Sequence, residues 1–110
     1  DSGCSNTTGY ANTLLGIYSG RNNTTGDFNT FIGISSGLNN TTGYCNTFLG
    51  ESSGCGNTSQ HHVTIVGNIP SVEASYDFAF GSKQEECNNY LFTCCNHLYW
   101  CHCTSLTQIA

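Results

Sequence analysis

The sequence is poor in charge, and above all in positive charge. Lys and Arg number 2 against 7 Asp and Glu in 110 residues, which gives a net charge of −5. The two basic residues, Arg21 and Lys83, lie far apart in the chain. Because nucleic-acid backbones are bound by clustered cations, we expect no nucleic-acid partner.

Long apolar runs are also missing. A membrane-spanning helix needs about 18 or more consecutive apolar residues, and no segment approaches that length, so we expect no membrane span. Polarity must come instead from uncharged Asn, Thr, Ser and Gly. Such a composition is common in disordered chains, but a strict sequence register argues against disorder here.

That register is a repeat of 17 residues (23 − 6). Asn-Thr-Thr-Gly begins at Asn6, Asn23 and Asn40, a related Asn-Thr-Ser begins at Asn57, and a last, shorter step leads to Phe78-Ala79-Phe80-Gly81. A unit this short cannot bury a face alone and must stack on its neighbours. The sequence therefore predicts an all-β domain over residues 1–82, a parallel β-roll or β-solenoid of about five short coils.

Each unit contains the segment Thr-x-(Leu/Ile/Val)-Gly, which predicts a short strand with alternate residues on opposite faces. We place the face that carries Thr and the last aliphatic residue inside the roll. The predicted core residues are Leu15, Ile32, Leu49, Val66, Phe78 and Phe80.

The strand position between them then points outward, as an apolar column of Leu14, Phe31, Phe48 and Ile65. A strip of large apolar side chains in water is unusual for a soluble monomer, and burying each one contributes roughly 1.5–3 kcal/mol. We therefore expect this column to form an interface between copies of the chain. The alternative is that both faces are internal, as in a flattened roll with a second layer.

The composition changes after Lys83. Residues 83–110 contain no Gly and most of the Cys, and we interpret them as a separate crosslinking or neck segment. Cys87, Cys94 and Cys101 recur every seven residues, which fits a short helical seam, whereas the neighbouring aromatic residues favour a strand. The sequence leaves a short helix and a strand both open.

Eight cysteines in so short a chain favour an oxidising, extracellular location with disulfides within or between chains. Zinc binding by the Cys and His of the tail is the alternative, but paired Cys-x2-Cys motifs are missing. Cys4 and Cys55 lie three coils apart, roughly 14 Å at about 4.7 Å per coil, so they should not bond within one roll. The crosslink candidates are Cys4, Cys45, Cys55, Cys87, Cys94, Cys95, Cys101 and Cys103.

No pattern indicates catalysis, a phosphate loop or a resident metal, so we expect a protein that is not an enzyme and needs no cofactor. His61 and His62 stand at a coil corner, where exposed turn residues are expected and a metal clip between copies is the alternative. Six asparagines fall in Asn-x-Ser/Thr sequons, which turn chemistry alone explains and which would carry glycans in a eukaryotic secretory setting. They are Asn6, Asn22, Asn23, Asn39, Asn40 and Asn57, and the candidate glycosylation positions, one per coil, are Asn6, Asn23, Asn40 and Asn57.

The unit Asn-Thr-Thr-Gly-x-x-Asn-Thr-x-(Leu/Ile)-Gly-x-x-x-Gly resembles the repeats of bacteriophage tail-fibre and bacterial surface-fibre proteins. Residues 3–82 are also similar, more distantly, to the head of trimeric autotransporter adhesins, to which Phe78-Ala79-Phe80-Gly81 is the nearest match. The resemblance implies a homotrimer of rolls on a virion or cell surface, with the tail as a stalk or neck. The many cysteines are a difference from those proteins, and they would allow the fibre to be covalently crosslinked.

These observations predict a structural module of an extracellular fibre, such as a phage tail fibre, virion or cell-surface filament, that is trimeric or polymerised and disulfide-stabilised. The alternative is an adhesin that binds a host glycan or receptor through exposed aromatics such as Tyr10, Tyr18 or Tyr44. A third, weaker interpretation is an ice-binding solenoid, because the Thr ladder here is a single column that we place inside.

Overall fold

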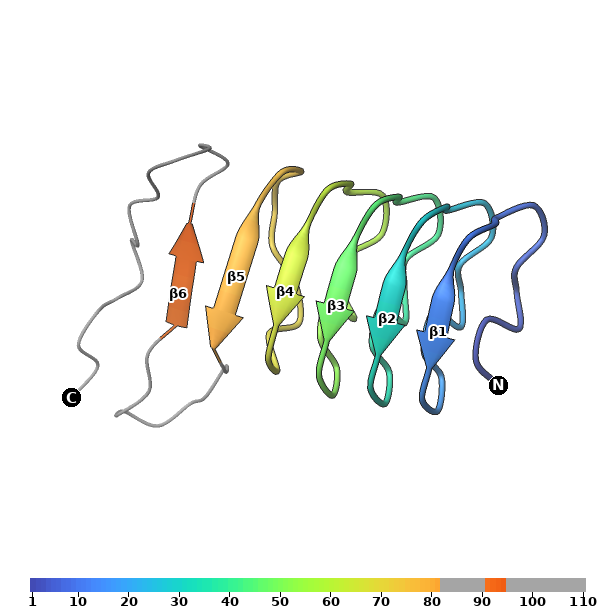
Figure 1. The fold of residues 1–110 in the computed structure, drawn as a ribbon, viewed down its shortest axis with the longest axis horizontal. Coiled ribbons are helices and arrows are strands. Elements are labelled where there is room, and N and C mark those ends of the chain that lie inside the picture. Colours follow the sequence, from blue (N-terminus) through green and yellow to red (C-terminus); the bar gives the residue numbers. More distant parts are fainter. Residues whose placement is uncertain (82–90, 95–110) are drawn as a thin grey trace.

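The computed structural model describes residues 1–81 and the strand at 91–94. Its backbone winds into about four turns of a β-solenoid, in which each turn contributes one strand to a single sheet (Figure 1). The strands follow one another in sequence order, and the first five are parallel. They are β1 (Thr13–Leu15), β2 (Thr30–Ile32), β3 (Thr47–Leu49), β4 (Thr64–Val66) and β5 (Phe78–Gly81). The predicted all-β solenoid is confirmed.

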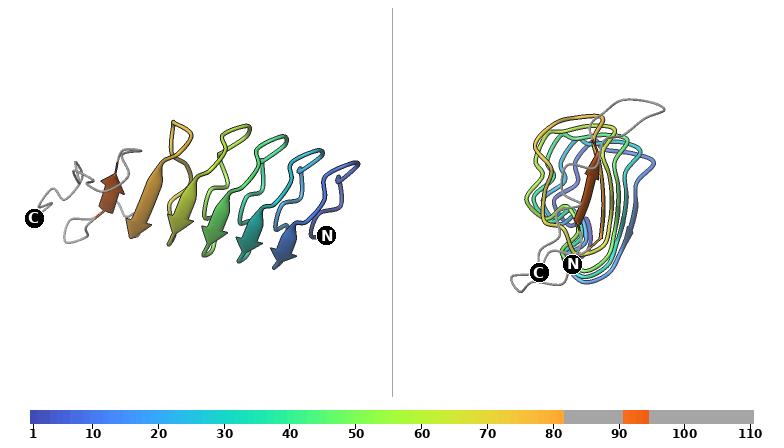
Figure 2. Two further views of the ribbon diagram at one scale, coloured as in Figure 1. Left: turned by 45° about the horizontal axis from the view of Figure 1, so that its top comes forward. Right: turned by 90° about the vertical axis from the view of Figure 1, so that its left-hand side faces the viewer.

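The register of the sheet follows the sequence repeat. Thr13 pairs with Thr30, which pairs with Thr47, while the shorter last step pairs Thr64 with Phe78. Equivalent residues therefore lie on top of one another, and the coils appear as nested loops in the end-on view of Figure 2.

A sixth strand, β6 (Leu91–Cys94), pairs antiparallel with β5 and covers that edge of the sheet. Unpaired strand edges recruit other chains, so this strand shields the backbone groups of the last coil. At residues 91–94 the tail thus forms a strand. The rest of the predicted neck segment, with the seven-residue Cys spacing, lies outside the described residues.

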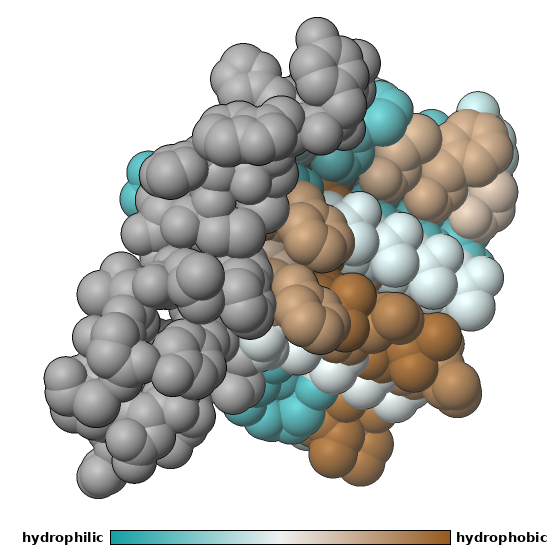
Figure 3. All heavy atoms as spheres, turned by 60° about the vertical axis from the view of Figure 1, so that its left-hand side comes forward, coloured by the Kyte–Doolittle hydropathy of each residue, from teal (hydrophilic) through white to brown (hydrophobic). Residues whose placement is uncertain are grey.

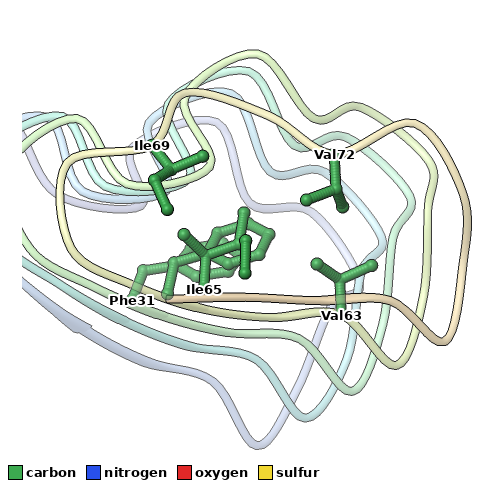
Figure 4. Close-up of a cluster of buried hydrophobic side chains, with 7 residues drawn as sticks. Phe31, Val63, Ile65, Ile69 and Val72 are labelled. Atoms are coloured by element: carbon green, nitrogen blue, oxygen red, sulfur yellow. The ribbon is translucent and has the colours of Figure 1, made fainter. Parts of the chain in front are cut away.

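The core of the solenoid is the middle position of each strand. Phe31, Phe48, Ile65 and Ala79 are all 0% exposed, and Leu14 packs against this cluster as a partly buried end. The rings of Phe31 and Phe48 stack face to face, with centroids 4.8 Å apart. Figure 4 shows Phe31 and Ile65 pointing from the sheet toward Ile69 and Val72 on the opposite wall.

The predicted assignment of the two strand faces is therefore wrong. The column predicted as an interface between copies, Leu14, Phe31, Phe48 and Ile65, is internal. The residues predicted as core point outward: Leu15 is 63% exposed, Ile32 36% and Phe80 48%. Phe78 is also exposed, and Leu49 and Val66 are half-buried on the same outer side. Among the described residues the two-layer alternative has no support either, because they bury only one face of the sheet.

The physical reason lies in the threonines and in the wall that faces the sheet. A Thr hydroxyl inside the roll would need a hydrogen-bond partner on every turn, whereas the middle column carries only carbon side chains. Opposite that column stands a row of glycines in which Gly37, at φ 62°, has no room for a Cβ against the Phe31 ring. The flat rings fit the narrow interior only on this glycine side.

The buried polar residues are satisfied along the stack. Ser19 Oγ donates to the Phe31 carbonyl at 2.9 Å, and Ser36 Oγ donates to the Phe48 carbonyl at 3.0 Å. Asn46 joins three coils. Its backbone N–H donates to Asn29 Oδ1 in the preceding coil, while its Nδ2 donates to the Gln60 carbonyl and its Oδ1 accepts the Val63 N–H in the next coil. These bonds make it possible to bury amides in a chain with few large apolar residues.

The face assignment is tested by two adjacent residues of β2. Phe31→Ala should lower the free energy of unfolding by about 3–5 kcal/mol, because it opens a cavity in the stacked core. Ile32→Ala on the outer side should cost about 1 kcal/mol or less. Denaturant unfolding of both variants, at a low protein concentration that excludes association effects, measures the difference. Equal losses, or a larger loss for Ile32→Ala, would contradict the assignment.

Candidate functional site

The strongest candidate for a functional surface is the outer sheet face, the side of β1–β5 that points away from the core. Each of its first four strands contributes one threonine and one aliphatic residue, and β5 contributes two phenylalanines. The outer sheet face comprises Thr13, Leu15, Thr30, Ile32, Thr47, Leu49, Thr64, Val66, Phe78 and Phe80.

This face has no charged side chain, and its apolar members form a continuous stripe. Figure 3 shows brown, apolar residues along the stacked coils beside a row of near-white, neutral ones. The strand register places Leu15, Ile32, Leu49 and Val66 in one row and the threonines in a parallel row. The surface is therefore striped, with one apolar row and one hydroxyl-bearing row.

Two further exposed apolar residues recur on successive coils just beyond the strand ends. Ile17 and Ile34 follow β1 and β2 and are 58% and 51% exposed. In the two coils after Ile34, the equivalent positions are Glu51 and Asn68. Asn68 Nδ2 donates a hydrogen bond of 2.8 Å to Glu51 Oε1. The sequence prediction missed Ile17 and Ile34, although their 17-residue spacing could have revealed the column.

The described residues leave the outer side of this parallel sheet uncovered, which is uncommon, since parallel sheets in proteins almost always have both faces buried. Complete burial of an exposed aliphatic side chain contributes roughly 1.5–3 kcal/mol, and the side chains of the outer sheet face, which are about half exposed, retain about half of that gain. A monomer in water gains nothing from this stripe. The outer sheet face is therefore suited to burial against another apolar surface.

Exposed aromatic rings line a second surface, at the corner that precedes each strand. Tyr10 and Tyr44, two of the predicted recognition residues, are exposed here, and the Phe28 ring meets Tyr10 edge to face at 5.2 Å. Further along the same corner, Tyr44 contacts His61 and His62. Tyr18, the third predicted recognition residue, lies at a different turn, where the Arg21 guanidinium sits over its ring at 4.9 Å.

Three of the predicted crosslink cysteines lie in the described coils. Cys4 is exposed, Cys45 and Cys55 are half-buried, and all three are free thiols. They form no disulfide with one another, in keeping with the three-coil separation of Cys4 and Cys55. For Cys94 the structure describes the backbone in β6. The remaining candidates, Cys87, Cys95, Cys101 and Cys103, lie outside the described residues.

Three of the four predicted glycosylation positions are contradicted. Asn23, Asn40 and Asn57 are completely buried, and the Nδ2 of each donates a hydrogen bond inside the solenoid. A glycan needs this nitrogen and open space, so these sequons are products of the coil chemistry. Asn6 alone of the four is exposed.

Within residues 1–81 and 91–94, no helix has the length and apolar character needed to cross a membrane. The same part of the chain has no group of three or more His, Cys, Asp or Glu side chains that could hold a metal ion. Comparison with protein-family models, curated proteins and solved structures finds no match to this chain.

The Cys55 thiol supplies a pH-dependent test. Burial raises the pKa of Cys55 above its ordinary value, and the Glu51 carboxylate raises it further. Because the thiolate is the reactive form, alkylation at Cys55 should keep accelerating with pH beyond the point where a free cysteine levels off. Mass spectrometry of iodoacetamide-treated, reduced protein measures this rate.

Glu51→Gln should increase the Cys55 rate at a fixed mildly alkaline pH, because it removes a negative charge that disfavours the thiolate. A short cysteine peptide is the control. A Cys55 profile that levels off together with the peptide would contradict the raised pKa.

Proposed function

We propose that this chain is a structural module of an extracellular fibre and that copies associate through the outer sheet face. The observation that carries the proposal is the uncharged, apolar stripe on an uncovered parallel sheet. It replaces the sequence-predicted interface, which lies in the core, but keeps the physical argument for association.

Several features of the solenoid support a structural role. Every coil is bonded to the next by backbone and side-chain ladders, so length is gained by adding coils without changing the cross-section. The described coils, by contrast, bring together no arrangement of side chains typical of a catalytic site. The eight cysteines also suit an oxidising exterior, because disulfides between copies would persist there.

The proposed assembly is a homotrimer or a polymer, with outer sheet faces turned toward one another. Leu15 and Ile32 of one copy would then pack on the equivalent stripe of the next, and the Thr rows would lie beside them. An arrangement of this kind covers the second face of each sheet, which is the usual state of parallel strands. The tail cysteines would add covalent links between copies.

A double substitution tests this interface. Leu15→Lys with Ile32→Lys should shift the chain from a trimer or larger species to a monomer, since two buried cations in an apolar contact are strongly unfavourable. Light scattering coupled to size-exclusion chromatography measures the mass, with and without reductant. Both residues are exposed, so folding should persist, as circular dichroism would show.

The matched control is Thr25→Lys with Thr42→Lys. These residues are exposed on neighbouring coils, lie off the outer sheet face and add the same charge. The control should retain the wild-type mass. A wild-type chain that is monomeric at all concentrations would overturn the association, and equal dissociation of both double variants would overturn the choice of face.

The outward-facing Thr ladder favours a second candidate, an ice-binding surface. The sequence interpretation ranked this function low partly because it placed the threonines inside, whereas Thr13, Thr30, Thr47 and Thr64 lie in register on the outer face. The row beside them is still aliphatic rather than a second Thr row. A monomer with thermal hysteresis that is lost in Thr30→Lys would establish this candidate, and a trimer without hysteresis would exclude it.

A further inference from the structure

His61 and His62 form a pair whose side chains meet, although neighbours in a chain usually point apart. The backbone of His62 has a φ of 57°, in the left-handed region. Ala11, Phe28 and Cys45 share this conformation at equivalent corners, so the repeat imposes it. At this coil alone among the described corners, the conformation brings two imidazoles together.

Two tyrosines hold the imidazoles from either side. Tyr44, one coil earlier, stacks on His61 with centroids 4.6 Å apart and planes 10° from parallel. Tyr76, one coil later, stacks on His62 at 4.8 Å and 12°. Each tyrosine also meets the other imidazole edge to face, at 5.6 Å and 5.1 Å. The two rings are therefore fixed relative to each other before any ligand arrives.

The Nδ1 atoms of the two histidines lie 3.1 Å apart. Only one of them carries the proton when this contact is a hydrogen bond between neutral rings, and the other presents its lone pair. Two nitrogens at this separation, each roughly 2.0–2.1 Å from a common ion, subtend an angle of about 100°. This angle lies between those of octahedral and tetrahedral coordination.

We propose that His61 and His62 chelate one divalent transition-metal ion, of the class Cu²⁺, Ni²⁺ or Zn²⁺, through their Nδ1 atoms. The ring that carries its proton on Nδ1 changes tautomer, with that proton released to water and another taken up on Nε2, so that both rings stay neutral and both Nδ1 lone pairs are free for the ion. Imidazole nitrogen is a preferred ligand of these ions, and the negative net charge of the chain favours cation binding. The site is independent of the outer sheet face and of the proposed association.

The described residues supply two ligands, so the remaining coordination positions belong to water or to an external group. Such a site lacks the closed shell of a structural zinc site and should exchange its metal readily. Its strength comes from the fixed geometry, because the second nitrogen binds without a further ordering cost.

The repeat itself provides substitutions that remove one ligand and keep the packing. His61→Tyr installs the residue that Tyr10 and Tyr44 occupy in the same column, and His62→Phe installs the equivalent of Phe28. Both variants should fold, because their backbone conformation and their ring stacking already occur elsewhere in the solenoid. His97→Ala, in the tail, is the control that removes a histidine elsewhere.

The experiment titrates the reduced full-length chain with Ni²⁺ and follows diethyl pyrocarbonate modification by mass spectrometry. This readout is specific to each peptide, so the Cys-rich tail is observed separately. In the wild-type chain and in His97→Ala, the peptide with His61 and His62 should become protected. In each single variant the remaining histidine should need at least about ten-fold more Ni²⁺, because chelation is lost.

Unchanged modification of this peptide across the titration would overturn the site. Protection midpoints that do not move in His61→Tyr and His62→Phe would equally overturn it, since the two nitrogens would then act separately. Unfolding curves of the variants establish that any loss of protection reflects the ligand and not the fold.

Discussion

Register between successive coils is the constraint on which the rest of this structure depends. The backbone N–H of Thr30 donates to the Asn46 carbonyl, and the Asn46 amide in turn serves Val63 and Gln60 in the next coil. Residues of successive coils thus satisfy one another's hydrogen-bonding groups, and a single coil has no independent stability. The ladder is weakest where the step shortens. Asn57 donates to the Val72 carbonyl instead of to Asn40, and Asn40 Oδ1 is left buried without a partner.

The same register turns single positions into surface columns. A residue type chosen once per repeat becomes a row, as with the aliphatic and Thr rows of the outer sheet face. A change in one coil creates a local feature instead. The column of Ile17 and Ile34 becomes polar at Glu51, and the aromatic corner gains two imidazoles at His61 and His62. Repetition therefore favours extended contacts, whereas departures from the repeat create local chemistry.

The sequence alone predicted the solenoid, its 17-residue register and all five parallel strands, because the repeat fixes which residues stack. It did not predict which strand face is internal, because Phe31 and Ile32 are both apolar and strand periodicity cannot rank them. The deciding information was present in the Thr that accompanies the outer aliphatic residue of each of the first four strands and in the glycine row opposite the rings. The contact between His61 and His62 could not be predicted, since it needs the left-handed backbone at His62.

Burial of the middle column also separates folding from the proposed association. The stacked Phe31 and Phe48 rings close the core within one chain, so the coils need no second copy to exclude water from it. The free energy of burying the apolar side chains of the outer sheet face is then available for contacts between molecules. An assembly built this way joins preformed rigid rods, and its strength can change through Leu15 or Ile32 without loss of the fold.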